Sequence, residues 1–221
     1  DGTTISKYSN VRVGFENDWD KIYAGGSQTT FAIKTNGSLW AWGNNITGQL
    51  GIGEFGYKTT PTQLFASEAT PKPQIFAGGY SSFEIKADGT LWAWGQNTSG
   101  QLGLGNKVNQ TIATQVGTAN DWLMISASSN FTIGLKKDGS LWGWGQNGIS
   151  GLLGIGDNTV IESLTPIRIG NSNDWTSISA GSSHTLAIKS NGTLWAWGGN
   201  SSGQLGDGTN TIILSPIQIG S

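Results

Sequence analysis

The chain contains no cysteine, and it has few of the side chains on which most enzymes depend. The lack of cysteine among its 221 residues excludes disulfides, thiolate nucleophiles and thiolate metal sites. Histidine occurs once, as His184, and only 12% of the residues are charged. The 12 basic and 14 acidic side chains give a net charge of −2, with no basic cluster beyond Lys136-Lys137. We therefore expect no binding to nucleic acid or to an anionic membrane surface.

Long apolar runs and helical periodicity are also missing. No run approaches the roughly 18 apolar residues of a membrane span, so no membrane insertion is expected. No stretch of ten or more residues follows the helical period, which predicts an all-β fold. The first residue is Asp1, without a preceding Met or signal-like segment, so we expect a processed chain or a piece of a longer one.

A Leu-Trp-Ala/Gly-Trp-Gly segment dominates what is present, because the chain repeats it four times. Eight of the eleven tryptophans lie in the copies Leu39–Gly43, Leu91–Gly95, Leu141–Gly145 and Leu194–Gly198. In a strand, alternate side chains share a face, so each copy has one bulky Trp face and one face of Leu and Ala or Gly. Such unlike apolar faces are buried together when similar sheets stack on one another.

The spacing of the copies indicates a repeat architecture. Their first tryptophans stand at 40, 92, 142 and 195, which gives intervals of 52, 50 and 53 residues. A period of this size is typical of propellers and solenoids, whose units cannot bury both faces alone. We place the repeats at approximately 15–66, 67–118, 119–170 and 171–221. Residues 1–14 match 207–220 without a gap, which predicts the tail strand of a preceding repeat.

Each repeat is expected to hold four strands. Three repeats open with Asn-Asp-Trp, whereas the second has Thr70-Pro71-Lys72-Pro73-Gln74 at this place. An Asn-Gly or Asp-Gly pair before each Trp strand predicts a type I′ hairpin turn. These pairs are Asn36-Gly37, Asp88-Gly89, Asp138-Gly139 and Asn191-Gly192. A Gly-Gln/Leu-Leu-Gly loop follows each Trp strand, and its Leu is expected to reach the core.

The whole motif series resembles the regulator of chromosome condensation repeat. The fourth unit carries it as Ala180–Ile188, Asn191-Gly192, Leu194–Gly198, Asn200 and Gly203–Gly206. The resemblance implies a β-propeller of four-stranded blades, usually seven, that presents loops to partners. The chain departs from the family in its recurrent His, since Thr29, Ser81 and Phe131 align with His184. It also lacks the wedge-like insertion of members that act as nucleotide exchange factors.

The chemistry-bearing residues are mostly explained by this repeat. The Trp side chains are interpreted as blade packing rather than as a stacking platform for ligands, and His184 as structural. Asp18, Asp121 and Asp174 recur at strand entries, which is not typical of a catalytic pair. We therefore predict no enzyme, no catalytic or metal-ligating residue and no cofactor. Glu84 is the exception, because it lies mid-strand where other repeats have Ala32, Gly134 and Ala187. A carboxylate at this position indicates a local ion pair with a lysine, a water-filled channel beside it, or a functional role.

Segments that differ between repeats are the best candidates for a binding surface. We select Phe55, Tyr57, Tyr80, Lys107 and Glu84 as partner-binding residues, since exposed aromatics often anchor protein interfaces. The predicted function is a non-enzymatic scaffold whose rim loops bind a protein partner. Alternatives are an inhibitor of a secreted enzyme, or a hydrolase or lyase with converging carboxylates over the propeller channel.

The sequence also bears on the cellular location of the protein and on whether its blades close into a ring. Seven Asn-x-Ser/Thr sequons favour an extracellular or cell-surface protein, and they begin at Asn36, Asn45, Asn97, Asn109, Asn130, Asn191 and Asn200. Four repeats are fewer than the family's usual number, and an open arc leaves apolar blade faces uncovered. We therefore expect the chain to belong to a larger propeller or to associate with another copy of itself.

Overall fold

The computed structural model describes residues 1–26, 28–66 and 74–220. The described residues form sixteen strands in four antiparallel sheets, which confirms the all-β prediction. Blade 1 holds β1 (Trp19–Gly25), β2 (Thr29–Lys34), β3 (Leu39–Gly43) and β4 (Lys58–Phe65). Blade 2 holds β5 (Gln74–Ala77), β6 (Ser81–Ile85), β7 (Leu91–Gly95) and β8 (Gln110–Gln115). Blade 3 holds β9 (Trp122–Ala127), β10 (Phe131–Lys136), β11 (Leu141–Gln146) and β12 (Glu162–Ile169). Blade 4 holds β13 (Trp175–Ala180), β14 (His184–Lys189), β15 (Leu194–Gly198) and β16 (Ile213–Ile219). Within the described ranges, no helix long and apolar enough to cross a membrane is present.

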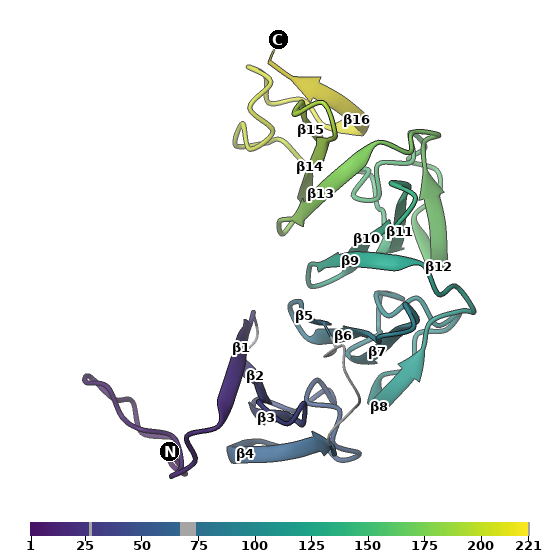
Figure 1. Ribbon diagram of the computed structural model, residues 1–221. Coiled ribbons are helices and arrows are strands. Elements are labelled where there is room, and N and C mark those ends of the chain that lie inside the picture. Colours follow the sequence, from purple (N-terminus) through teal and green to yellow (C-terminus); the bar gives the residue numbers. More distant parts are fainter. Residues whose placement is uncertain (27, 67–73, 221) are drawn as a thin grey trace.

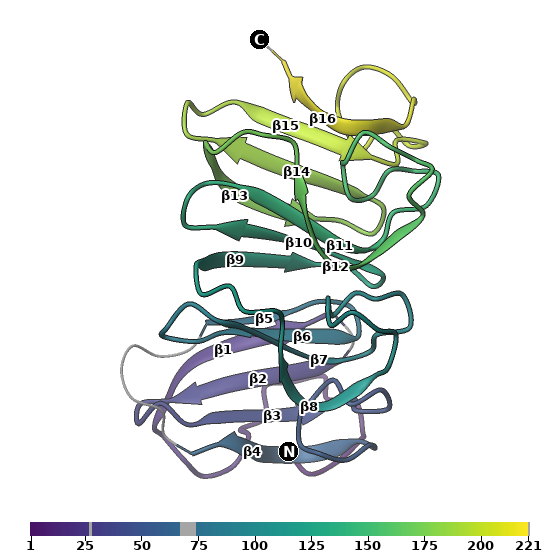
Figure 2. The same ribbon diagram turned by 90° about the vertical axis from the view of Figure 1, so that its right-hand side faces the viewer.

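The four blades form an open arc (Figures 1 and 2). The strands of each blade follow one another in chain order, from the concave side of the arc to its convex side. The inner strands β1, β5, β9 and β13 contact one another in series. The chain termini lie at opposite ends of the arc (Figure 1). We call the face that each blade turns toward the next one its forward face, and the opposite one its rear face.

Strand register places the two faces of each Trp strand as the alternation predicts. In blade 2, Trp94 lies on the rear face and packs with Phe31 and Ile33 of blade 1. Trp144 and Trp197 occupy the same position in blades 3 and 4, and all three indoles are fully buried. The Trp strands supply Leu and Ala or Gly to the forward faces, where Phe31, Phe83 and Ile133 of the second strands lie opposite the small residue. Trp42 differs because no blade formed by the described residues lies against its rear face, and it is only half-buried.

Each buried indole is also held by a hydrogen bond across the blade interface. Trp94 Nε1 donates to the Gln49 carbonyl at 3.0 Å, and Trp144 Nε1 donates to the Gln101 carbonyl at 2.8 Å. Trp197 Nε1 donates to the Leu152 carbonyl at 3.2 Å. The accepting residues lie in the Gly-Gln/Leu-Leu-Gly loops of the preceding blades. The last Gly of each loop lies against the same indole, so the loop backbone and the ring form one contact.

The hairpins before the Trp strands are not type I′ turns, so that prediction is wrong. A type I′ turn needs positive φ at two residues, but only Gly37, Gly89, Gly139 and Gly192 have it there. Lys34 pairs with Ser38 around a three-residue loop, and Gly37 N donates to the Lys34 carbonyl at 2.9 Å. The Asn36 side chain instead accepts hydrogen bonds from Ser38 N and Oγ, at 3.0 and 2.8 Å. Asx residues recur here because their oxygen closes the turn, and the left-handed conformation is left to glycine.

The N-terminal segment and the start of the second repeat are also the subject of predictions. Residues 1–14 form no strand, contrary to the prediction. Their counterpart in blade 4, β16, pairs with β15, whereas the described residues hold no strand that pairs with residues 1–14 in this way. The unusual opening of the second repeat at Thr70–Gln74 lies almost wholly outside the described residues.

The close approach of a loop glycine to an indole can be tested with two matched glycine substitutions. Gly154 and Gly206 both have φ +72°, but a Cβ at Gly154 would lie 2.5 Å from Trp197 Nε1. At Gly206 the nearest atom would be Ile219 Cγ2 at 3.8 Å. We expect Gly154→Ala to lower the free energy of unfolding by about 1–3 kcal/mol more than Gly206→Ala, because only the first overpacks a blade interface. Urea denaturation measures the difference, and equal losses would show that the interface is not tightly packed.

The Asx turns generate a prediction about acid stability. Hydrogen bonds from the Thr90 hydroxyl and backbone N–H hold the pKa of Asp88 below its usual value. A lowered folded-state pKa contributes stability above the unfolded pKa of about 3.9, and this contribution is lost as pH falls through the folded value. Asp88→Asn keeps the accepting oxygen, as Asn36 does, but cannot titrate. We expect denaturant midpoints of the variant to fall less than those of the parent between about pH 5 and 2. Asn36→Asp is the reciprocal control and should add acid sensitivity.

Candidate functional site

The connections between strands lie on two opposite rims of the arc, one at each end of the strands. Loops after the first and third strand of each blade lie on one rim, because neighbouring strands are antiparallel. We call this the long-loop rim, since it carries the connections β3–β4, β7–β8, β11–β12 and β15–β16. The opposite hairpin rim carries the short Asx turns. Phe55, Tyr57, Tyr80 and Lys107 all lie on the long-loop rim, so the structure brings four of the five selected residues to one rim.

Exposed apolar side chains gather on the long-loop rim. Phe55 is 60% exposed, Tyr57 63% and Tyr80 38%. The residues selected from the sequence leave out further exposed apolar residues of the same loops, although Val108, Ile149 and Ile161 lie in segments that differ between repeats. They are Ile46, Val108, Ile149, Ile161 and Ile212. All four blades therefore contribute apolar side chains to this rim.

A buried asparagine fixes the path of each long loop. Asn45 Nδ2 donates to the Glu54 carbonyl at 2.6 Å, and Asn45 Oδ1 accepts from Leu50 N at 2.9 Å. Both ends of the loop are thus tied to one fully buried side chain, while Leu50 enters the core. Phe55 and Tyr57 come directly after the tied segment and stand outside it.

The same asparagine recurs in the other blades and accounts for part of the sequon pattern. Asn97 and Asn200 are fully buried and make the equivalent bonds to Leu102 N and Leu205 N. Sequons at Asn45, Asn97 and Asn200 therefore belong to the folding motif. The extracellular location stays a prediction, and it depends on the exposed sequons at Asn36, Asn130 and Asn191.

Two ion pairs lie on the long-loop rim. Lys107 Nζ lies 2.5 Å from Glu162 Oε2, which joins a loop of blade 2 to the start of β12 in blade 3. Lys58 Nζ lies 2.6 Å from Glu54 Oε1 within blade 1. Within each pair the two partly exposed charges neutralise each other, so Lys107 and Lys58 add no net charge to this rim.

Glu84 lies apart from the other four selected residues. It is fully buried on the rear face of blade 2, where its Cα partners are Ile75 and Trp92. The described residues contain no group of three or more His, Asp or Glu side chains that could hold a metal ion. His184 begins β14 at the register of Thr29, Ser81 and Phe131, as the sequence alignment predicts.

The hairpin rim holds a repeated cation that sequence reasoning did not identify. Lys189 Nζ lies 4.7 Å from the Trp175 ring centroid and 4.6 Å from that of Trp195, and 3.1 Å from Asp174 Oδ1. Lys34 and Lys136 make the same contacts with two Trp rings and one Asp. The signal was present, because Lys ends the second strand in every repeat. Asp18, Asp121 and Asp174 thus have a structural partner, which agrees with a strand-entry role.

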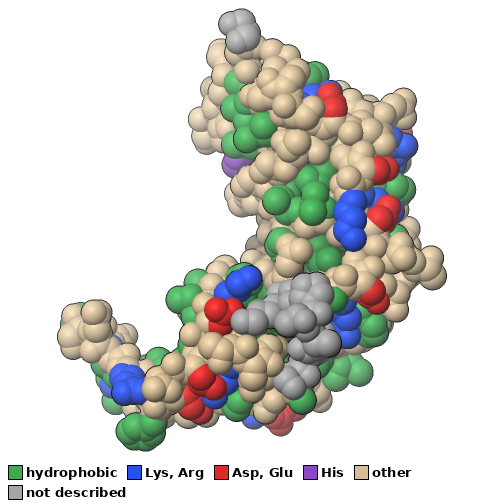
Figure 3. All heavy atoms as spheres, viewed as in Figure 1, with side chains coloured by type: hydrophobic (Ala, Val, Ile, Leu, Met, Phe, Trp, Pro, Cys, Tyr) green, Lys and Arg blue, Asp and Glu red, His purple; other side chains and the backbone are tan. Residues whose placement is uncertain are grey.

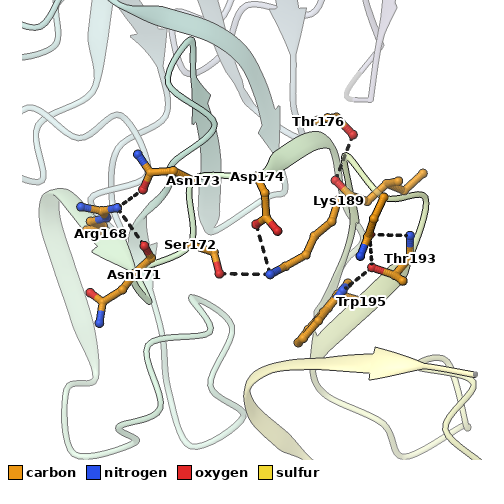
Figure 4. A network of polar contacts seen from close by, with 11 residues as sticks. Arg168, Asn171, Ser172, Asn173, Asp174, Thr176, Lys189, Thr193 and Trp195 are labelled. Atoms are coloured by element: carbon orange, nitrogen blue, oxygen red, sulfur yellow. Dashed lines mark hydrogen bonds and ion pairs between the residues drawn. The ribbon is translucent and has the colours of Figure 1, made fainter.

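Further polar contacts extend this network between blades 3 and 4 (Figure 4). Lys189 Nζ donates to Ser172 Oγ at 3.0 Å, and Arg168 donates to the Asn171 carbonyl at 3.2 Å and to Asn173 Oδ1. Asn173 Nδ2 in turn donates to Asp138 Oδ2 of the neighbouring turn at 3.2 Å. Basic and acidic side chains lie beside one another along the arc in Figure 3. Because its charges are paired and its turns are repeated, the hairpin rim is interpreted as scaffold.

Comparison with protein families supports this architecture. Sequence profiles of the regulator of chromosome condensation (RCC1) repeat match residues 36–85, 88–135, 138–188 and 191–221. A second profile of the same repeat matches 19–49, 74–101, 125–148 and 175–204. The ultraviolet-B receptor UVR8 of Arabidopsis thaliana is 31% identical over 203 residues, which cover 90% of this chain and 46% of the receptor. The probable E3 ubiquitin-protein ligase HERC3 of Homo sapiens is 30% identical, over 88% of this chain and 19% of the ligase.

Solved structures share the fold. Human WBSCR16 aligns with a TM-score of 0.80 at 23% identity, over 96% of this chain and 55% of that one. Yeast RCC1 (Prp20), solved bound to Kap60, aligns with a TM-score of 0.81 at 22% identity, over 95% of this chain and 50% of that one. The chain thus spans about half the length of these relatives or less. The four matched repeats and the four blades together show that the chain belongs to the regulator of chromosome condensation repeat family.

Proposed function

We propose that the chain is a non-catalytic scaffold that binds a protein partner through its long-loop rim. The observation that carries this proposal is the gathering of exposed Phe, Tyr, Ile and Val side chains from all four blades on that rim. Aromatic side chains supply large contact area at low entropic cost, and they are enriched where proteins bind one another. The paired charges of Lys107 and Glu162 suit the polar border of such an interface.

The relatives support a protein rather than a nucleic acid as the partner. The yeast member was solved in complex with Kap60, and a further structure of it is described together with its binding to Gsp1p and histones. The net charge of −2 and the ion pairs of Lys34, Lys136 and Lys189 favour a protein over a phosphate-rich ligand. We therefore expect an apolar or mixed protein surface as the ligand.

The proposal is tested by comparing the two rims within the full chain. A Phe55→Ser/Tyr57→Ser variant removes two exposed anchors from blade 1, whereas Leu123→Ser removes a 40% exposed leucine near the hairpin rim. We expect the first variant to weaken binding of a captured partner by at least about 10-fold and the second to leave it unchanged. Affinity capture followed by a titration with each purified partner measures both.

A photo-crosslinker at each rim supplies an independent readout. Placed at position 57, it should label the partner, and placed at position 123 it should not. Equal binding by the two serine variants, or labelling from position 123 alone, would contradict the assignment to the long-loop rim.

A further inference from the structure

The outer strand of each blade forms an edge of its sheet. These strands are β4, β8, β12 and β16, and they lie on the convex side of the arc (Figure 1). An edge strand presents N–H and C=O groups to which a strand of another chain can pair. A neighbouring blade covers a face of the sheet and not this edge, so the edge of blade 2 stays open although blades 1 and 3 lie on either side of it. Proteins commonly block such edges with proline or with charged side chains.

Proline occupies the same place in three of the four outer strands. In each blade this place is the residue just before the partner of the small Ala or Gly of the Trp strand. It is Pro61 in β4, Pro166 in β12 and Pro216 in β16, but Ala113 in β8. Since three blades fold without an N–H here, the fold does not need the N–H that Ala113 retains.

The N–H of Ala113 faces away from its own sheet. Val116 N donates to the Leu91 carbonyl of β7 at 2.8 Å. In an antiparallel pair, alternate residues turn their backbone groups toward the neighbouring strand. Thr114 therefore also faces β7, whereas Ala113 and Gln115 turn their N–H and C=O groups outward. A strand added to β8 finds a donor and an acceptor at the place where the other blades have proline.

Charge is missing from the same edge. Strand β4 contains Lys58, and β12 contains Glu162 and Arg168. Strand β16 is uncharged but contains Pro216. Of these four outer strands, only β8 (Gln110–Gln115) lacks both charge and proline. Two copies of β8 can therefore pair without placing like charges opposite each other, and the edge carries no charge that would select a partner of opposite sign.

Apolar surface lies beside the open edge. Ile112, the residue before Ala113, is 59% exposed. A hollow of about 330 Å³ opens next to these two residues, and Leu64, Phe65 and Trp92 contribute to its lining. A second strand on β8 would thus cover apolar surface in addition to making hydrogen bonds, which favours association in water.

We propose that two copies of this chain pair through β8, edge to edge and antiparallel, about a two-fold axis at Ala113. Each Ala113 N–H donates to the Ala113 carbonyl of the second copy, so one small residue supplies both reciprocal bonds. The axis is perpendicular to the joined sheet, so the two Ile112 side chains lie on the same face, on either side of the axis, and contact each other. This contact is on the convex side of the arc and does not depend on partner binding by the long-loop rim.

The first test blocks the edge with the residue that the other blades use. Ala113→Pro should leave the fold intact, because three blades already hold proline at this place. We expect the full-length parent to pass from its monomer mass of 23.2 kDa to a dimer as its concentration rises. Ala113→Pro should raise the dissociation constant by at least about 10-fold, since it removes both reciprocal bonds. Sedimentation equilibrium measures the masses, and circular dichroism checks the fold.

Two lysine variants separate this edge from other exposed apolar positions. Ile112→Lys places two like charges on one face beside the axis and should weaken the dimer by at least about 10-fold. Ile161→Lys is the control, because Ile161 is 65% exposed but lies on the long-loop rim of blade 3. The control should associate like the parent. Association that Ala113→Pro and Ile112→Lys leave unchanged belongs to another surface and overturns the proposal.

Disulfide trapping tests the two-fold register. The chain has no cysteine, so Ala113→Cys introduces a single thiol. Opposite Cα atoms of a hydrogen-bonded antiparallel pair lie about 5.5 Å apart, a separation that a disulfide spans. With an added thiol oxidant, we expect Ala113→Cys to form a covalent dimer much faster than the more exposed control Ile161→Cys. Equal rates from the two positions contradict the register. A pure parent that stays monomeric at all concentrations overturns the proposal, even if β8 then pairs with a strand of another protein.

Discussion

The contact between a buried indole and the loop of the preceding blade is the constraint on which the rest of the structure depends. A four-stranded blade of this size cannot cover its own faces, so it is stable only against a neighbour. Trp94, Trp144 and Trp197 each fill that gap, and each also satisfies its indole N–H on a loop carbonyl of the preceding blade. The loop must therefore pass close under the ring, which only glycine permits at positive φ.

This constraint also separates scaffold from binding surface. Residues that serve the fold recur between repeats, including the buried asparagine of the long loops in all four blades and the Lys-Trp-Asp arrangement of the hairpin rim in blades 1, 3 and 4. The long loops are fixed at both ends by the asparagine, as Asn45 shows with Glu54 and Leu50. Side chains that lie outside the tied segment vary from blade to blade. Apolar residues such as Phe55 and Ile161 are therefore free to serve recognition.

The limits of sequence reasoning follow from the range of the interactions concerned. Face alternation of the Trp strands and the register of His184 depend on strand geometry alone, and both were predictable. The turn type was not, because Asn-Gly and Asp-Gly suit both a type I′ turn and a three-residue loop in which the Asx oxygen closes the turn. Lys189 and its two Trp rings were visible as a repeated lysine, but only packing shows what a cation contacts. The rim residues were selected by variation, and topology then showed that four of them share one rim.

The sequence by itself determined the all-β class, the number of repeats, the bulky and small faces of each Trp strand and the absence of thiol chemistry. These follow from composition and from periods of two and about fifty residues, which need no knowledge of long-range contacts. Only the tertiary structure decided which rim collects the exposed aromatics, that Glu84 is buried between blades, and that residues 1–14 form no strand. It also decided that Ile22 and Leu194 are uncovered although their repeat counterparts are core residues. Burial is a property of neighbours in space, and identical repeat positions differ wherever the arc of blades ends.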